Sequence, residues 1–352
     1  MSKNTQKDKV AVVLFNLGGP DNLGAVKPFL FNLFFDKKII RLPLVLRYIV
    51  AKIISSKREN TAKEIYQKMG GKSTILDQTI SQLNAIKTQL SKDDSRIYEV
   101  FISMRYWHPM SDETIKKIEE FAPTEMILVP LYPQFSSTTT SSSFEDFFKK
   151  IGKTSLKDIK QKAICCYHNE DFFSKAYASL IENEISKVKD KNNYRVLFSA
   201  HGLPRKIIEQ GDPYQWQVEA SVNAVIDNMS FEIDDYKITY QSRVGPLEWI
   251  GPSTDEEIEK AAKERKEIVV VPIAFVSEHS ETLVELDIEY KAIADEYKVN
   301  YLRVPTLATN STYINGLADL IIDFSKKEEE KFIKSANNSR ICPANFNDCM
   351  CK

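Results

Sequence analysis

Histidine is the side chain best suited to proton transfer near neutral pH, and only four histidines occur among the 352 residues. His201 follows the apolar run 196–198 and precedes Gly202, which allows the backbone to turn sharply. An imidazole placed there could act as a base or a metal ligand. The same position would also suit a histidine that only bonds backbone groups at the end of a strand.

The acidic segment 277–290, SEHSETLVELDIEY, is the second candidate for chemistry. Its glutamates recur at i, i+3, i+7 and i+11, so a helix would carry all four on one face. No Lys or Arg lies four residues from any of them. The pattern predicts either a solvated acidic face or a track of carboxylates suited to hard cations and protons. The four residues are Glu278, Glu281, Glu285 and Glu289.

Both candidates depend on elements that can be predicted from the alternation of short apolar runs with helical periodicity. This alternation favours an α/β fold whose parallel sheets are joined by right-handed helical crossovers. A polar break at 187–194 indicates two doubly wound, Rossmann-like lobes, and a ligand cleft is expected at the carboxyl ends of their strands. The predicted strands are 10–15, 98–102, 126–131, 195–199, 237–240, 268–273 and 301–304, and the predicted helices are 63–90, 111–121, 172–187, 217–228 and 277–297.

Composition narrows the possible partners and the location. The 48 basic and 49 acidic side chains give a net charge of −1, which argues against nucleic acid as a partner. No apolar run of about 18 residues predicts a transmembrane helix, and no signal peptide is recognisable. We therefore expect a cytoplasmic protein with reduced thiols. The predicted domains are an N-terminal lobe at 1–187, a C-terminal lobe at 188–330 and an extension at 331–352.

Six segments of the chain resemble ferrochelatases, and they occur in the order found in that family. Several are long and distinctive, and together they extend over most of residues 10–320. The resemblance implies a porphyrin cleft between the two lobes and insertion of Fe²⁺ into protoporphyrin IX, the terminal step of haem synthesis. The segments are NLGGPD (16–21), MRYWHP (104–109), LYPQFSSTTTSSS (131–143), SAHGLP (199–204), YQSRVGPLEWIGPSTDE (240–256) and VPIAFVSEHSETLVELDIEY (271–290).

The resemblance also assigns roles to individual residues. His201 occupies the position of the family's essential histidine, and Glu281 that of the carboxylate facing it, where both would handle protons or the Fe²⁺ substrate. Glu285 and Glu289 continue the acidic track, and Glu278 stands where some relatives carry Asp. The residues that match the lining of the porphyrin pocket are Leu17, Arg105, Tyr106, Tyr132 and Trp249.

Two other functions fit parts of this pattern. A related chelatase could use another metal or another tetrapyrrole such as coproporphyrin, a choice that depends on the polarity of the pocket. A porphyrin or haem carrier with the same fold would have no need for a histidine opposite a glutamate. The joint presence of His201 and Glu281 therefore favours an enzyme.

Three of the five cysteines lie within the last eleven residues. Their spacing, Cys-x₆-Cys-x-Cys, resembles the C-terminal ligands of ferrochelatases that hold a [2Fe-2S] cluster, which needs four thiolates. Some relatives supply an internal ligand at the position that Ser137 occupies here, so the fourth thiolate is expected from Cys165 or Cys166. Free thiols and a structural zinc are the alternatives. The tail cysteines are Cys342, Cys349 and Cys351.

The segment 26–54 is strongly apolar but is interrupted by charged residues and by Pro43. It could form ordinary helices packed on the core. The family resemblance implies a lip over the porphyrin cleft that also touches a membrane, and apolar side chains mixed with Lys and Arg are typical of interfacial attachment. We therefore expect peripheral association with the inner membrane.

Overall fold

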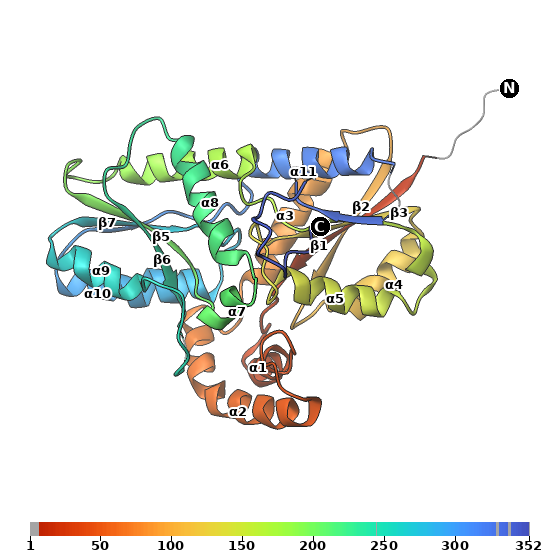
Figure 1. Ribbon diagram of the computed structural model, residues 1–352, viewed down its shortest axis with the longest axis horizontal. Helices are drawn as coiled ribbons and strands as arrows, with labels where there is room; N and C mark the ends of the chain where they lie inside the picture. Colours follow the sequence, from red (N-terminus) through yellow and green to blue (C-terminus); the bar gives the residue numbers. More distant parts are fainter. Residues whose placement is uncertain (1–6, 244, 329–330, 337–338, 352) are drawn as a thin grey trace.

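The computed structural model describes residues 7–243, 245–328, 331–336 and 339–351. Two parallel β-sheets form its frame, one with the strand order β2-β1-β3-β4-β9 and the other with the order β6-β5-β7-β8 (Figure 1). Helices cover both sheets, so the predicted α/β architecture with two lobes is confirmed. The strands are β1 (Lys9–Asn16), β2 (Ile97–Met104), β3 (Glu125–Pro130), β4 (Lys160–Ile164), β5 (Tyr194–His201), β6 (Tyr236–Gln241), β7 (Glu267–Pro272), β8 (Tyr301–Arg303) and β9 (Lys331–Lys334).

All seven predicted strands are present, and two further strands were missed. The sequence of β4, KQKAI, gave no strand signal because it carries polar side chains at positions that the structure buries. Lys162 is fully buried there and forms an ion pair of 2.5 Å with Glu125. It also donates to the main-chain oxygen of Phe324 over 2.6 Å, so tertiary partners make a lysine acceptable inside the sheet.

One predicted helix, 63–90, is in fact divided between two helices. Gly70 and Gly71 separate them with φ values of 85° and 88°, a conformation that interrupts a right-handed helix. The helices are α1 (Val26–Phe34), α2 (Leu44–Lys68), α3 (Ile75–Leu90), α4 (Ser111–Phe121), α5 (Thr140–Ile151), α6 (Asp171–Ile185), α7 (Arg205–Glu209), α8 (Tyr214–Asp227), α9 (Thr254–Lys263), α10 (Lys291–Glu296) and α11 (Ser311–Ser325), with 3₁₀ turns η1 (Leu23–Ala25) and η2 (Ser155–Asp158).

The predicted helix 277–297 also differs from an ordinary α-helix. Its first part, η3 (Glu281–Tyr290), is a π-helix, and α10 continues directly from it. Such wide turns are rare and occur frequently at functional sites. The acidic segment is therefore helical from Glu281 onward, whereas Glu278 precedes the helix, and the side chains are spaced differently around the axis.

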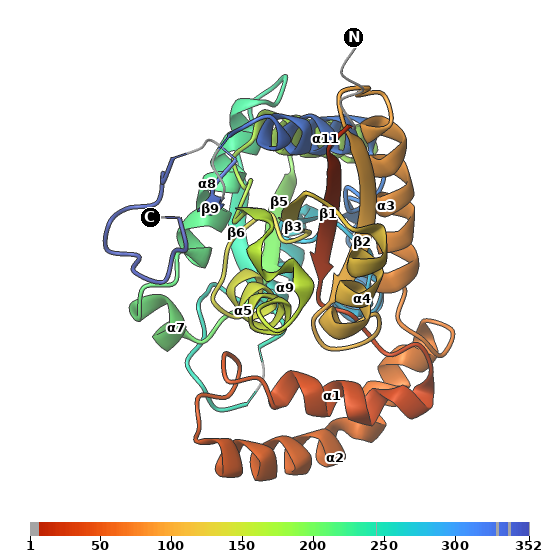
Figure 2. The ribbon, with the colours of Figure 1, turned by 90° about the vertical axis from the view of Figure 1, so that its right-hand side faces the viewer.

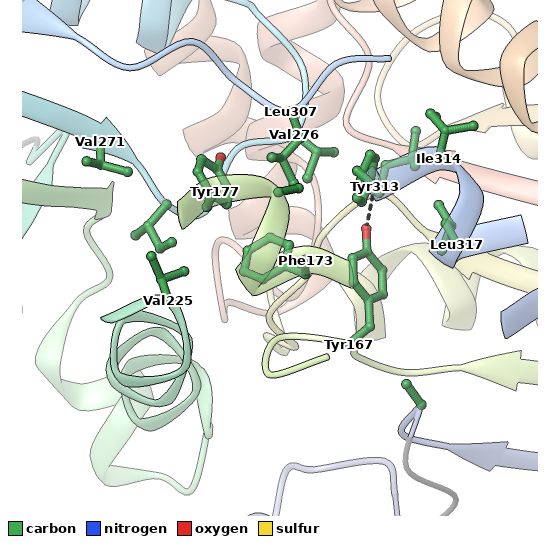
Figure 3. Packing of buried hydrophobic residues seen from close by; sticks show 14 of the residues in the cluster. Tyr167, Phe173, Tyr177, Val225, Val271, Val276, Leu307, Tyr313, Ile314 and Leu317 are labelled. Atoms are coloured by element: carbon green, nitrogen blue, oxygen red, sulfur yellow. Dashed lines mark hydrogen bonds between the residues drawn. The ribbon is translucent and has the colours of Figure 1, made fainter. Parts of the chain in front are cut away.

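The largest apolar core joins the two lobes. It contains side chains from both sheets and from α6, α8 and α11. Figure 3 shows Tyr167 and Tyr313 within it, with their hydroxyl groups 3.0 Å apart. Because α11 packs on α3 and α6, and β9 pairs with β4, the end of the chain returns to the first sheet. The domain limits at 187 and 330 remain predictions.

The segment 26–54 forms α1 and the first part of α2, which pack against each other and lie beneath both sheets in Figures 1 and 2. Three aromatic rings, Phe31, Phe35 and Tyr48, hold them together with centroid separations of 5.4–6.0 Å. In the described part of the chain, no helix combines the length and apolar character that a membrane span requires.

Candidate active site and cysteine cluster

His201 is the last residue of β5, where the carboxyl end of the strand meets the π-helix. Its Nδ1 lies 2.5 Å from the main-chain oxygen of Gly202, which fixes the orientation of the ring. Its Nε2 lies 3.4 Å from Oε1 of Glu281. The imidazole is about one-third exposed, so the pair remains accessible from outside the protein (36% for His201). The structure thus brings together the two residues predicted to be catalytic.

Close packing next to His201 depends on Gly202. A Cβ atom at this position would lie 2.9 Å from the main-chain oxygen of Gln241 and 3.3 Å from the ring of Trp249. Gly202 therefore allows strand β6 and Trp249 to approach the end of β5. Of the predicted pocket residues, Trp249 is the one that the structure places next to Gly202 and so close to His201.

Glu281 has a second histidine partner that the sequence analysis missed. Nε2 of His279 lies 3.4 Å from Oε2 of Glu281, while its Nδ1 faces the main-chain oxygen of Ser277 at 2.8 Å. Burial disfavours the charged carboxylate, yet the charge of His201 and the hydrogen bond and charge of His279 lower the pKa of Glu281 to about 2. Burial likewise disfavours protonation of His279, but Glu281 raises its pKa above the ordinary value. The signal for His279 was its place two residues before the predicted carboxylate.

Tyr66 of α2 is a second residue that sequence reasoning missed. Its hydroxyl bonds Ser280, and burial together with the nearby charge of Glu281 raises its pKa. Further along, Thr74 donates to the main-chain oxygen of Glu278 over 2.7 Å. The end of α2 and the turn after it therefore border the residues that lead into the π-helix, Glu278 and Ser280.

The other glutamates of the acidic segment have different surroundings. Glu278 is paired with Arg303 of β8 at 2.6 Å, so it is neutralised by a residue distant in sequence. Glu289 is exposed and lies 3.3 Å from Lys68. Among the described residues, Glu285 accepts hydrogen bonds from neutral groups alone, those of Gln241, Ser242 and Tyr290. The four carboxylates are thus not equivalent.

The remaining predicted pocket residues occur at the end of the first sheet. Arg105 donates to Asp36 over 2.8 Å and to Ser142 over 2.7 Å. Tyr106 is fully buried, and its hydroxyl also donates to Asp36. In this conformation Tyr106 anchors the lip through Asp36 and presents no surface to a ligand. Leu17 and Tyr132 are partly buried nearby.

All five cysteines are buried and belong to one cluster, although they come from the end of β4 and from the C-terminal tail. The sulfur atoms of Cys165 and Cys166 are 3.6 Å apart. The tail meets this pair at Cys351, where a hydrogen bond with the Cys165 thiol lowers the pKa of Cys351 to about 6. The thiol of Cys349 similarly lowers the pKa of Cys342.

The groups around Cys342 favour its thiolate form. Gln217 of α8 donates its amide to the sulfur of Cys342 over 3.1 Å, and the charge of Arg340 favours the ionised form of the same thiol. Trp216 and Phe346 pack over the cluster. In the described residues, no group of three or more His, Cys, Asp or Glu side chains is arranged to hold a single metal ion.

Comparison with solved structures identifies the class to which this fold belongs. SirB from Bacillus subtilis with Fe³⁺ aligns with 92% of this chain and 98% of its own, at a TM-score of 0.55 and 9% identity. The sirohydrochlorin chelatase SirB from Bacillus subtilis subspecies spizizenii, in complex with cobalt, gives a TM-score of 0.54 over the same shares of both chains. The architecture is therefore that of the chelatases.

Sequence comparison narrows this class to one family. The sequence model of the family described as Ferrochelatase matches residues 9–324. The ferrochelatase of Rickettsia bellii (strain OSU 85-389) is 53% identical over 349 residues, which are 99% of this chain and 96% of the relative. That of Pelagibacter ubique (strain HTCC1062) is 50% identical over 346 residues, 97% and 98% of the two chains. This chain belongs to the ferrochelatase family.

Proposed function

We propose that this enzyme of haem synthesis inserts Fe²⁺ into protoporphyrin IX at the site formed by His201 and Glu281. Family membership supports iron insertion into a porphyrin. The observation that supports this location is the array His201–Glu281–His279, in which one carboxylate with a low pKa lies between two imidazoles at 3.4 Å.

Metal insertion requires the removal of two protons from pyrrole nitrogens and of water from the iron. Because Nδ1 of His201 faces a carbonyl oxygen, its Nε2 can carry the lone pair that accepts a proton. Glu281 stabilises the imidazolium that results, and its ionised oxygens can also hold Fe²⁺. His279 orients Glu281 from the other side.

We assign the porphyrin to the space bordered by Trp249 and by the residues at the end of the first sheet. Planar porphyrin shields its nitrogen atoms, so a pocket that binds a bent ring more tightly than a flat one lowers the barrier to insertion. Leu17, Tyr132 and Trp249 supply apolar walls, and Arg105 supplies a cation for the ring's carboxylates. Tyr106 acts through the lip rather than by contact with the ring.

The test of this proposal is turnover in anaerobic conditions, followed as loss of porphyrin fluorescence after Fe²⁺ is added. We expect His201→Ala to lower kcat/KM by at least about 100-fold, the usual size of a general-base contribution. His108→Ala is the matched control, because His108 is exposed and bonds only Glu113 among the described residues. A folded His201→Ala enzyme with normal turnover would refute the proposal. Tight porphyrin binding without metallation would favour a carrier or another metal.

We further propose that the cysteine cluster holds a [2Fe-2S] centre. The donor set fits in type and number, since five buried thiols are available where four are needed, and hydrogen bonds already join two pairs of them. Cys342, Cys349 and Cys351 would supply three ligands, and Cys165 or Cys166 the fourth. When bound, the cluster would supply either an iron–sulfur link between the tail and the first sheet or a redox-active group.

Absorption and EPR spectra of anaerobically purified protein test this assignment, together with iron and sulfide content. Cys349→Ser should lose the visible bands. The single variants Cys165→Ser and Cys166→Ser identify the fourth ligand, because only the variant that lacks it should lose the cluster. A colourless wild-type protein with zinc bound at the cysteines would overturn the assignment.

Finally, we propose that the lip contacts a membrane surface. Seven large apolar side chains are exposed on α2 and just before it, and Val45 (70%) and Leu44 (62%) are the most exposed. Arg41, Arg47 and Lys52 lie among them, as expected for a segment at an anionic lipid surface. Val45→Glu should reduce co-sedimentation with phosphatidylglycerol vesicles, whereas Ile97→Glu, at an exposed position in β2, should not. Equal binding of both variants would refute the proposal.

A further inference from the structure

Gln217 lies in the first turn of α8, and the iron insertion proposed above does not use its side chain. The side chain is fully buried, so both ends of its amide need hydrogen-bond partners within the protein. Those partners belong to two segments far apart in the sequence, the loop after β3 and the C-terminal tail. Gln217 therefore lies where the first sheet, α8 and the tail meet.

The orientation of the Gln217 amide is determined by Phe135. The main-chain N–H of Phe135 donates to Oε1 of Gln217 over 2.6 Å. A main-chain N–H can only donate, so the oxygen of the amide must face Phe135 and the NH₂ group must point away from it. That NH₂ group lies 3.1 Å from the sulfur of Cys342. The donor that Gln217 presents to this sulfur is thus fixed by a backbone contact.

The tail is held against the residues just before α8. The main-chain N–H of Asp348 donates to the main-chain oxygen of Gly211 over 3.1 Å. A Cβ atom at Gly211, whose φ is 103°, would lie 2.9 Å from the main-chain nitrogen of Asn347, so the close approach depends on glycine. This docking keeps Cys342 within reach of Gln217, although the two residues are 125 positions apart.

The turn that contains Cys342 is fixed by Arg340. The guanidinium group of Arg340 donates over 2.8–3.1 Å to the main-chain oxygens of Cys342, Pro343 and Phe346. The backbone around Cys342 is therefore held by one side chain, and its sulfur is bonded by another, that of Gln217. Two independent groups thus determine the position of a predicted cluster ligand.

A hydrogen bond to a cysteine sulfur changes the reduction potential of an iron–sulfur cluster. The sulfur atoms become more negative when such a cluster gains an electron, and an N–H donor interacts more strongly with a more negative sulfur. The reduced form is therefore stabilised more than the oxidised form, and the potential rises. A buried donor has a larger effect than an exposed one, because little water screens it.

We propose that Gln217 is a positioning residue for the [2Fe-2S] centre: it orients the thiolate of Cys342 as a ligand, and its N–H···S hydrogen bond raises the reduction potential of the centre. The inference rests on the proposed ligation by the cysteines. It goes further because it assigns a residue outside the ligand set that determines a property of the cluster.

The test is a potentiometric titration of the full-length, anaerobically purified protein with dithionite, followed by visible absorption and EPR. Gln217→Met preserves the length of the side chain and removes the donor. At a given potential, we expect the ratio of reduced to oxidised cluster to fall about threefold to tenfold in this variant. For one electron, this corresponds to a shift of about 30–60 mV toward more negative potential.

Gln82→Met is the matched control. Gln82 is also fully buried, and its amide donates to the main-chain oxygens of Val276 and Ala308 over 2.8 and 3.2 Å. The control variant removes an equally buried amide, so it should lower stability by a similar amount. It should leave the potential of the cluster unchanged, because its donors face carbonyl groups and not a sulfur.

A second measurement uses the wild-type protein and does not depend on how a variant folds. Glutamine labelled with ¹⁵N at its side chain is incorporated, the cluster is reduced, and pulsed EPR detects labelled nitrogen close to the unpaired spin. Among the described residues, Gln217 is the glutamine whose side chain bonds a cysteine. We therefore expect a ¹⁵N coupling in the wild-type protein and its loss in Gln217→Met.

The outcomes separate this inference from the assignment of the cluster. An unchanged potential in Gln217→Met, or an equal shift in both variants, would overturn the role of Gln217 alone. If Gln217→Met does not fold or takes up no cluster, the labelled wild-type protein decides: a ¹⁵N coupling supports the inference, and its absence refutes it. A wild-type protein without an iron–sulfur cluster would show that the assignment of the cysteines is wrong, and the role of Gln217 would fail with it.

Discussion

The charge of Glu281 allows a quantitative prediction about stability. Its pKa of about 2 lies below the ordinary value of 4.5, and a difference of about 2.5 pH units corresponds to about 3.4 kcal/mol of interaction with the charged form. A quarter of the side chain is exposed to solvent (25%). Because solvent screens this exposed part, the charge of Glu281 should contribute about 2 kcal/mol to the free energy of unfolding.

Glu281→Gln removes this charge while preserving the shape of the side chain. The raised pKa of His279 depends on Glu281, and a raised pKa in the folded state adds stability below the unfolded value of about 6.5. That contribution is lost as the pH rises through the folded pKa. The lowered pKa of Glu281 instead adds stability above pH 4.5. That stability is lost only as the pH falls from 4.5 toward about 2. Between pH 6 and 9 the Glu281 carboxylate stays ionised, whereas the imidazole of His279 beside it loses its proton.

We therefore expect Glu281→Gln to lower the free energy of unfolding by about 2 kcal/mol at pH 6, and by clearly less at pH 9. Urea unfolding followed by tryptophan fluorescence at both pH values measures the difference. Glu289→Gln is the control, because Glu289 is exposed and its ion pair with Lys68 should contribute less than about 1 kcal/mol. A deficit in Glu281→Gln that is independent of pH, or larger at pH 9, would refute the reasoning.

Two further substitutions test how the site is supported. Arg303→Met leaves Glu278 and Asp287 without their cation, and should lower the free energy of unfolding by about 3–5 kcal/mol in urea; a change below about 1 kcal/mol would contradict the buried network. Gly316→Ala would place a Cβ atom 2.1 Å from that of Phe172. The cost of overpacking, about 1–3 kcal/mol, should outweigh a gain of about 1 kcal/mol in helix propensity. The melting temperature should therefore fall. A higher melting temperature would show that α6 and α11 separate easily.

The sequence predicted those parts of the fold in which local pattern and tertiary environment agree. Strands such as β1 and β7 are continuous apolar runs, and both of their faces are buried. Strand β4 was missed because its stability depends on the pairing of Lys162 with Glu125, which local hydrophobicity does not report. The division between α2 and α3 was also missed, although Gly70 and Gly71 marked the place.

The residues of the candidate site also divide into those that the sequence predicted and those that it missed. His201 and Glu281 could be found because one ends a strand of the second sheet and the other follows the next strand, and the family resemblance gave them roles. Gln217 and Tyr66 were missed because their importance lies in contacts between elements distant in sequence. Glu278 was grouped with the track because Arg303, its partner, lies 25 residues further along the chain.

The distribution of partners supports the proposal that a nearly neutral protein attracts iron to one place. The sequence gives 48 basic and 49 acidic side chains, a balance that implies no particular site. In the structure, Glu278 and Glu289 are matched with Arg303 and Lys68. Within the described part of the chain, Glu281 instead pairs with two histidines, and Glu285 accepts hydrogen bonds from neutral donors alone. In the mechanism we propose, a divalent cation near Glu281 meets negative charge that no Lys or Arg among the described residues cancels. A histidine that becomes protonated during the reaction then weakens that attraction when the metal must leave for the porphyrin.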